Sequence, residues 1–312
     1  MLQARKLTFF PNGCTFFLLC IILYLQTILF ISIISSAGHA SLTFLRCGPA
    51  GINLYTGNPG RTVNDLEGII SDELLIYRGR DIFIKDGIII HQPTLDEICD
   101  YGERKYWSMV YTLTSVGADM KFQLHDIGID YTEISDFELF YSLLSRSFDQ
   151  SKTSIIFGDL NLSGFQLLQN EATGDLVMCD PDNGIQIDEY TYLLIADVLR
   201  KIHGLTRNSQ VPANQSTKQI LIDDAREEYE RNKNTEYHSQ LKNLISAMVN
   251  CEGFKYNHSE VWNMKISAFM DSVRRISKMK NADLLLQSGY SGFGINLKDI
   301  SEKQLDWLGD LN

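Results

Sequence analysis

The stretch Asp81 to Trp107, DIFIKDGIIIHQPTLDEICDYGERKYW, decides how the fold begins. Two short isoleucine-rich runs flank Asp86-Gly87, a dipeptide that accepts the positive φ angles of a tight hairpin turn. Pro93 then ends strand pairing, because proline has no backbone N–H. Thr94 with Glu97 three residues later is the pattern of a capping box at a helix start. The stretch therefore predicts a β-hairpin that leads directly into a helix, with Gly102 as its weak position.

The same stretch also contains the residue types of a metal or catalytic site, including His91 and Cys99. Helix capping and core packing explain these residues better than a metal or catalytic site does. Asp96 and Glu97 fall in the first turn of the predicted helix, where the helix dipole favours negative charge. Cys99, like Cys179 and Cys251, has apolar sequence neighbours, and a free thiol in such surroundings behaves as a small hydrophobe. We therefore expect a structural role for this stretch.

Downstream patterns extend the fold. Ser135 and Glu138 form a second capping-box pattern, Thr153 to Leu168 is strand-like, and Asp175 to Asp188 predicts a hairpin with its turn at Pro181 to Gly184. After Glu189 the apolar residues recur mainly at helical spacing. The sequence thus predicts an α+β, mainly helical fold, in which a β-hairpin-containing N-terminal part precedes an α-helical C-terminal part.

The acidic turn near Asp180 resembles a calcium loop only superficially. An EF-hand loop needs glycine at its sixth position and glutamate at its twelfth. Counted from Asp180, Gly184 is the fifth residue and Thr191 the twelfth. The spacing excludes an EF-hand, and we predict no metal site.

The composition of the chain divides it into four segments. We expect a hydrophobic N-terminal extension at 1–62, a mixed α+β domain at 63–204, a polar linker at 205–217 and an α-helical domain at 218–312. Within the extension, Cys14 to Ser36 is apolar throughout and long enough to cross a bilayer. It is interpreted as a membrane anchor, as a signal peptide, or as translated sequence upstream of the true start.

The charge of the chain is unevenly distributed. The formal net charge is −11, and the first 64 residues carry four basic and no acidic side chains, so the remainder carries −15. A body this acidic is repelled by nucleic-acid phosphates, which disfavours nonspecific DNA or RNA binding. Basic or polar protein partners suit it better.

Motifs that carry chemistry are absent from the sequence. It contains no Gly-x-x-x-x-Gly-Lys-Ser/Thr phosphate loop, no Gly-x-Ser-x-Gly elbow and no His-Glu-x-x-His pair. Ser288 to Gly294, SGYSGFG, resembles a phosphate loop only loosely, because it follows a predicted helix rather than a strand. We predict a protein that is not an enzyme and uses no cofactor.

The C-terminal part contains the candidate partner-binding residues. One helical run carries an apolar stripe that includes methionine, and methionine adapts to varied hydrophobic surfaces. The stripe either covers a partner's helix or packs within the protein. Arg274, Arg275, Lys278 and Lys280 lie in the same run and form either a solvated face or an anion-binding patch. The candidate residues are Met248, Phe269, Met270, Val273, Arg274 and Arg275.

Five separated blocks carry a family resemblance. They are IHQPTLDEICDYGERKYWSMVYTL, DIGIDYTEISDFELF, IIFGDLNLSGF, LLLQSGYSGFG and LDWLGDL. From about Val63 to the end, the chain resembles proteins of tailed bacteriophages and prophages of Gram-positive gut bacteria, most closely tail assembly chaperones. The resemblance implies binding of the tape measure protein before tail tube subunits polymerise around it, in the cytoplasm of the infected host. The alternative is a membrane-anchored protein that uses residues 14–36 as a span.

We expect translation to begin near Val63, because the following residues have the composition of a soluble domain and the preceding ones do not. Intact-mass measurement of the protein from infected cells checks this. Detection of peptides between Ser41 and Arg61 would contradict it.

Overall fold

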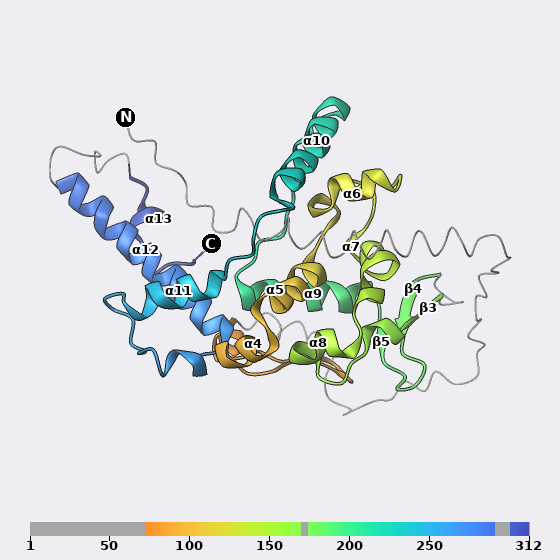
Figure 1. Cartoon of the computed structure of the whole chain (residues 1–312), viewed down its shortest axis with the longest axis horizontal. Helices are drawn as coiled ribbons and strands as arrows, with labels where there is room; N and C mark the ends of the chain where they lie inside the picture. The colour runs from red at the N-terminus through yellow and green to blue at the C-terminus, as the bar shows by residue number, and fades with distance from the viewer. Residues whose placement is uncertain (1–72, 170–173, 291–299, 312) are drawn as a thin grey trace.

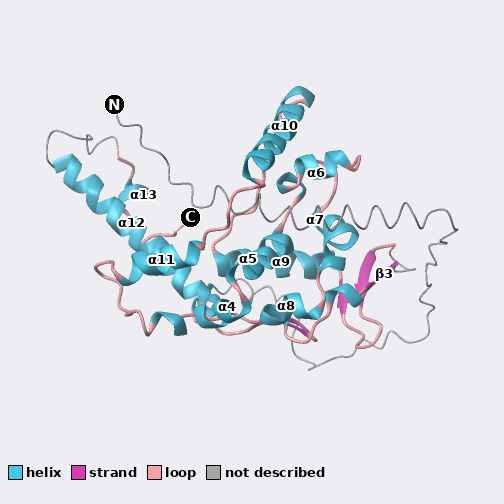
Figure 2. Cartoon of the chain, viewed as in Figure 1, coloured by secondary structure: helices cyan, strands magenta, loops and turns pink. Residues whose placement is uncertain are grey.

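The computed structural model describes residues 73–169, 174–290 and 300–311. Small antiparallel sheets lie in the N-terminal half and helices follow (Figure 2), which confirms the predicted α+β, mainly helical fold. The elements are α3 (Glu73–Tyr77), β1 (Ile82–Lys85), β2 (Ile88–Ile90), α4 (Leu95–Tyr101), α5 (Glu103–Thr114), α6 (Lys121–Asp126), α7 (Asp136–Leu139), the π-turn η2 (Phe140–Leu144), α8 (Gln150–Phe157), β3 (Gln166–Gln169), β4 (Leu176–Cys179), β5 (Gln186–Ile187), α9 (Glu189–His203), α10 (Gln215–Asn232), α11 (Gln240–Val249), α12 (Ile266–Tyr290) and α13 (Glu302–Leu305). Short 3-10 turns lie at Gly117–Asp119, Ser145–Ser147, Leu162–Gly164 and Val261–Asn263.

The first hairpin and its helix form as the sequence predicts. Strands β1 and β2 pair antiparallel, and Gly87 in the turn has a φ angle of 82°. The Thr94 hydroxyl accepts a hydrogen bond from the backbone N–H of Glu97 at 3.2 Å, and the Glu97 carboxylate accepts one from the Thr94 N–H at 2.6 Å. These two bonds confirm the capping box, which fixes the direction in which α4 leaves the hairpin.

The helix after the hairpin is divided in two at Gly102. This residue has a φ angle of 99°, outside the range of a right-handed helix, so α4 ends at Tyr101 and α5 begins at Glu103. The carboxylate of Glu103 accepts hydrogen bonds from the backbone N–H groups of Gln240 and Leu241, at 2.9 and 2.8 Å. The break at Gly102 therefore places an acidic side chain at the start of α11, where the helix dipole favours it.

The strand predicted from Thr153 to Leu168 is wrong in its first part. Residues up to Phe157 belong to α8, and only Gln166–Gln169 form a strand. A short apolar run does not distinguish a buried strand from a buried helix by periodicity. Packing decides here, because Ile156 is 1% exposed and its carbonyl accepts a hydrogen bond from the His91 N–H at 2.8 Å.

The second predicted hairpin is confirmed. Strand β4 pairs antiparallel with β3 on one side and β5 on the other. In the turn, the Asp180 carboxylate accepts hydrogen bonds from the Asp182 N–H at 3.0 Å and from the Asn183 side-chain amide at 2.7 Å. These bonds lower the pKa of Asp180. Turn formation thus accounts for this acidic loop. Within the described ranges, no group of His, Cys, Asp and Glu side chains could hold a metal ion.

Helix α9 lies at the centre of the core. It packs against α3, α5, α7, α12 and strands β1 and β5, and in Figure 1 it runs beside α5 through the middle of the molecule. Its side chain Tyr192 is 1% exposed and stacks on Phe140 with ring centroids 4.4 Å apart. Gly204 follows the helix with a left-handed φ of 63°, as expected for a C-cap. The buried side chains of both halves of the chain join one continuous cluster around this helix.

Two buried polar side chains connect α5 to α9. The Tyr106 hydroxyl donates to Nε2 of His203 at 2.5 Å, and Nδ1 of His203 donates to the Leu199 carbonyl at 2.6 Å. Because Nδ1 carries the proton, Nε2 is free to accept, and the imidazole is neutral. Burial lowers the pKa of His203 to about 4 and raises the pKa of Tyr106.

Helix α10 projects from the body (Figure 1) and contacts α6. The ring of Tyr229 lies 5.1 Å from that of Phe122, and Arg226 forms a two-point salt bridge with Asp126, at 2.8 and 2.5 Å. Residues 205–214 form the loop before it. The division into domains at 205–217 stays a prediction.

Across the part of the chain that the structure describes, no helix combines the length and the apolar character needed to cross a bilayer. The apolar run Cys14 to Ser36 and the predicted start near Val63 both lie outside the described residues.

We expect the free energy of unfolding to fall by about 3 kcal/mol as the pH drops from 6.5 to 4, because of His203. Over that interval the unfolded chain binds a proton on this histidine and the folded chain does not. Urea unfolding at several pH values measures the effect. His203→Gln should flatten the dependence in this interval, and an unchanged slope in this variant would contradict the role of His203.

Candidate functional site

The structure places the apolar part of the predicted partner-binding set inside the core. These four side chains belong to α11 and the first half of α12, and they pack within the hydrophobic cluster. The folded chain therefore does not present them to a partner, because their apolar faces are already covered. These residues therefore fit the second interpretation of the apolar stripe, in which it packs within the protein. Their exposed fractions are 5% for Met248, 0% for Phe269, 3% for Met270 and 6% for Val273.

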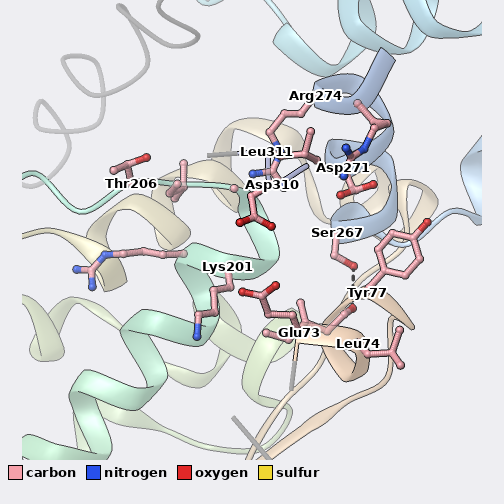
Figure 3. A pocket seen from close by; sticks show the side chains of 15 residues that line it. Glu73, Leu74, Tyr77, Lys201, Thr206, Ser267, Asp271, Arg274, Asp310 and Leu311 are labelled. Carbon is pink, nitrogen blue, oxygen red and sulfur yellow. Dashed lines mark hydrogen bonds between the residues drawn. The ribbon is translucent and has the colours of Figure 1, made fainter. Parts of the chain in front are cut away.

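Arg274 and Arg275, the charged members of that set, instead line a cleft of about 680 Å³. Figure 3 shows its walls: Glu73 and Tyr77 come from α3, Lys201 from the end of α9, and Asp271 and Arg274 from α12. Asp310 and Leu311 of the C-terminal segment also line it. The cleft therefore brings together four segments that are separated in the sequence.

The last turn of α9 supplies two cations with different roles. Arg200 is 8% exposed, and its guanidinium donates to the Thr114 carbonyl, the last residue of α5, at 2.7 Å. Lys201 is partly exposed and forms an i,i+4 salt bridge with Asp197 at 2.9 Å. Arg200 therefore holds α9 against α5, while Lys201 contributes positive charge to the surface of the cleft.

Arg274 lies against the C-cap of α9. The left-handed φ of Gly204 favours glycine, and a β-carbon there would meet Nη1 of Arg274 at 2.8 Å, so the guanidinium would have to shift. Nε of Arg274 is shielded from solvent and has no hydrogen-bond acceptor among the described residues. Leaving such a donor without an acceptor costs about 1–3 kcal/mol. Because Nε has no contact with solvent, a ligand in the cleft reaches it only if the Arg274 side chain moves.

The other cations of the basic run hold the C-terminal segment. Arg275 donates to the carbonyl oxygens of Trp307 and Gly309, at 2.5 and 2.8 Å, and Lys278 donates to that of Asp310 at 2.6 Å. All three acceptors are main-chain atoms. The sequence interpretations of this run, a solvated face or an anion-binding patch, both missed a role in binding the chain's own backbone.

The second half of α12 and the segment after α13 expose apolar side chains. Helix α12 continues to Tyr290, and in Figure 1 it runs past α13 to the edge of the molecule. The exposed fractions are 37% for Met279, 65% for Leu284, 79% for Tyr290, 42% for Trp307 and 74% for Leu308.

A second, more apolar pocket of about 440 Å³ lies between α4 and α11. Leu95, Ile245 and Trp262 line it, and Cys99 contributes to its wall. The expectation that Cys99 packs as a small hydrophobe is wrong, because its side chain is exposed. No sequence pattern distinguished this thiol from a buried one, because its position depends on where α11 docks.

The side chains of the 680 Å³ cleft are suited to binding a ligand through hydrogen bonds and charge. Its hydroxyl side chains are Tyr77, Thr206 and Ser267, and that of Ser267 donates to the Ile76 carbonyl at 3.5 Å. No histidine or cysteine occurs among its described lining residues. Arginine and lysine donors beside Asp271 and Asp310 can bind carbonyl and carboxylate oxygens through charge-assisted hydrogen bonds.

Residues 231–312 match the family model described as the YomV second domain. The match covers the end of α10, α11, α12 and the C-terminal segment, so it includes Arg274, Arg275 and Lys278. No curated protein and no solved structure matches the chain.

We expect Arg200→Met to lower the free energy of unfolding by about 1–3 kcal/mol, because it leaves the buried Thr114 carbonyl without its charged donor. The same change at the neighbouring Lys201 removes only an exposed i,i+4 pair and should cost less than about 0.5 kcal/mol. Urea unfolding of the two variants measures the difference. Equal costs would contradict the structural role of Arg200.

Proposed function

We propose that the protein is a non-enzymatic phage morphogenesis factor, and that its C-terminal region binds another protein. One observation carries the proposal. The exposed apolar side chains of Met279, Leu284 and Tyr290, with Trp307 and Leu308 nearby in the chain, occur within the segment that matches the YomV second domain. YomV is a prophage protein, which agrees with the phage origin that the sequence blocks indicate.

The specific role that we propose is that of a tail assembly chaperone. Its client would be the tape measure protein, which it keeps soluble in the cytoplasm of the infected host until tail tube subunits polymerise. Exposed apolar groups on the second half of α12 would cover apolar helical faces of the client. The acidic body, with a charge of −15 from Asp65 to Asn312, would keep the complex soluble through charge repulsion.

This proposal moves the contact surface along α12. The sequence places the partner face near Phe269 and Met270, which are buried, whereas the exposed apolar groups begin at Met279. The first half of the helix is anchored in the core, so the second half is held in position without a cost in ordering when the client binds.

A membrane-anchored protein is the second candidate. The apolar run Cys14 to Ser36 favours it, since the run is long enough to span a bilayer. Fractionation of cells that express the full chain tests it. Recovery in the membrane fraction, lost on removal of residues 1–62, would support the anchor over a protein that acts in the cytoplasm.

Co-expression with the tape measure protein of the same phage tests the chaperone role. We expect the tape measure to become soluble and to co-purify. Leu284→Glu should weaken co-purification at least about tenfold, because it places a charge in an apolar contact. Ile220→Glu is the matched control, since Ile220 is similarly exposed, at 58%, but lies on α10.

Two outcomes would contradict the proposal. One is a tape measure that stays insoluble while the protein alone is monomeric and binds duplex DNA at physiological salt. The other is equal loss of co-purification with both glutamate variants, because a contact confined to the end of α12 cannot depend on α10.

A further inference from the structure

Strand β3 is an edge strand of the three-stranded sheet. The strand order is β3-β4-β5, so β3 pairs with β4 on one side only. In an antiparallel pair, every second residue directs its backbone N–H and C=O groups away from the partner strand. Among the residues that the structure describes, these outward groups of Gln166–Gln169 have no hydrogen-bond partner. The edge therefore offers unused backbone donors and acceptors.

This edge also lacks the features that usually block strand addition, which are a charged side chain, a proline or a bulge. In the other sheet, β1 carries Lys85, and its pairing with β2 is irregular between Phe83 and Lys85. The opposite edge strand, β5, is only two residues long and packs on α9. By contrast, β3 has the sequence QLLQ and pairs with β4 in a regular register, and Leu167 is 41% exposed.

The segment that contains this sheet carries only negative charge. Residues 153–199 include all three strands and contain eight acidic side chains but no lysine, arginine or histidine. Asp175, immediately before β4, and Asp182, in the turn after it, are both exposed. At the end of β5, Asp188 already attracts a cation, since Lys85 lies 4.0 Å from its carboxylate. Such surroundings attract a basic segment and repel a second copy of this acidic chain.

We infer that the outer edge of β3 binds an extended basic segment of a partner protein, which adds a fourth strand to the sheet. Hydrogen bonds from the main chain of the segment satisfy the outward groups of β3, and an apolar side chain of the segment packs on Leu167. The acidic surroundings select lysine and arginine at its other positions. The inference goes beyond the proposed function, because in Figure 1 the sheet lies at the opposite end of the molecule from α12.

The test uses a fluorescein-labelled peptide of alternating lysine and valine, KVKVKVK, added to the full chain at physiological salt. A second peptide has proline in place of the central valine, which keeps the charge but interrupts strand pairing. A third has glutamate in place of every lysine. We expect the proline peptide to bind at least about tenfold more weakly than the parent, because pairing is lost, and the glutamate peptide not to bind.

Two matched variants locate the site. Leu167→Lys places a charge on the edge and should weaken binding of the parent peptide at least about tenfold. Leu193→Lys adds the same charge to the same acidic segment at a side chain that is similarly exposed, at 39%, but lies on α9. It should change the affinity less than about twofold, because a single distant charge is screened. In the wild type, bound peptide should also slow hydrogen exchange at residues 166–169.

Four results would overturn the inference. The first is no binding of the parent peptide, and the second is equal binding of the proline peptide, which would indicate charge attraction without strand pairing. The third is equal weakening by the two lysine variants. The fourth is dimerisation of the wild type that Leu167→Lys abolishes, which would assign the edge to a second copy of this chain. Leu284→Glu should bind the peptide as the wild type does, so this inference and the chaperone role fail separately.

Discussion

The burial of α9 is the constraint on which the rest of the structure depends. This helix contacts both sheets and four other helices, so its position fixes theirs. Two polar side chains make the position specific. His203 accepts the Tyr106 hydroxyl, and Arg200 donates to the Thr114 carbonyl, so a sliding of α9 along α5 would leave buried polar groups without partners. Hydrophobic contact supplies most of the stabilisation, and these bonds select one register.

The same anchoring gives α12 two functional halves. Its first half packs against α9 and α3, with Phe269 fully buried, and its second half emerges with Leu284 and Tyr290 exposed. A helix fixed at one end is a stiff support for a binding surface at the other. Where the two halves meet, Arg275 holds the main chain of the C-terminal segment.

Charge is organised around this framework. The one basic run of the C-terminal part lies on α12, beside the cleft, while the body as a whole is acidic. Helix α10 is attached through salt bridges, Arg226 to Asp126 and Lys218 to Asp130, together with buried Ile222 and the ring contact of Tyr229 with Phe122. Hydrogen bonds from Lys218 and Thr132 lower the pKa of Asp130 to about 2, so this attachment persists throughout the physiological pH range.

The sequence by itself determined the local elements of this protein. The Asp86-Gly87 hairpin, the Thr94 capping box, the Gly204 C-cap and the long final helices all depend on neighbours within a few residues, and all were predictable. It also placed Arg274 and Arg275 among the candidate binding residues. Tertiary structure decided the rest. Residues 153–157 form a helix because of contacts with β2, and an apolar stripe does not reveal whether its own core or a partner covers it, because both bury the same surface. Arg275 binds the C-terminal backbone only because the fold brings residues 32 positions apart together.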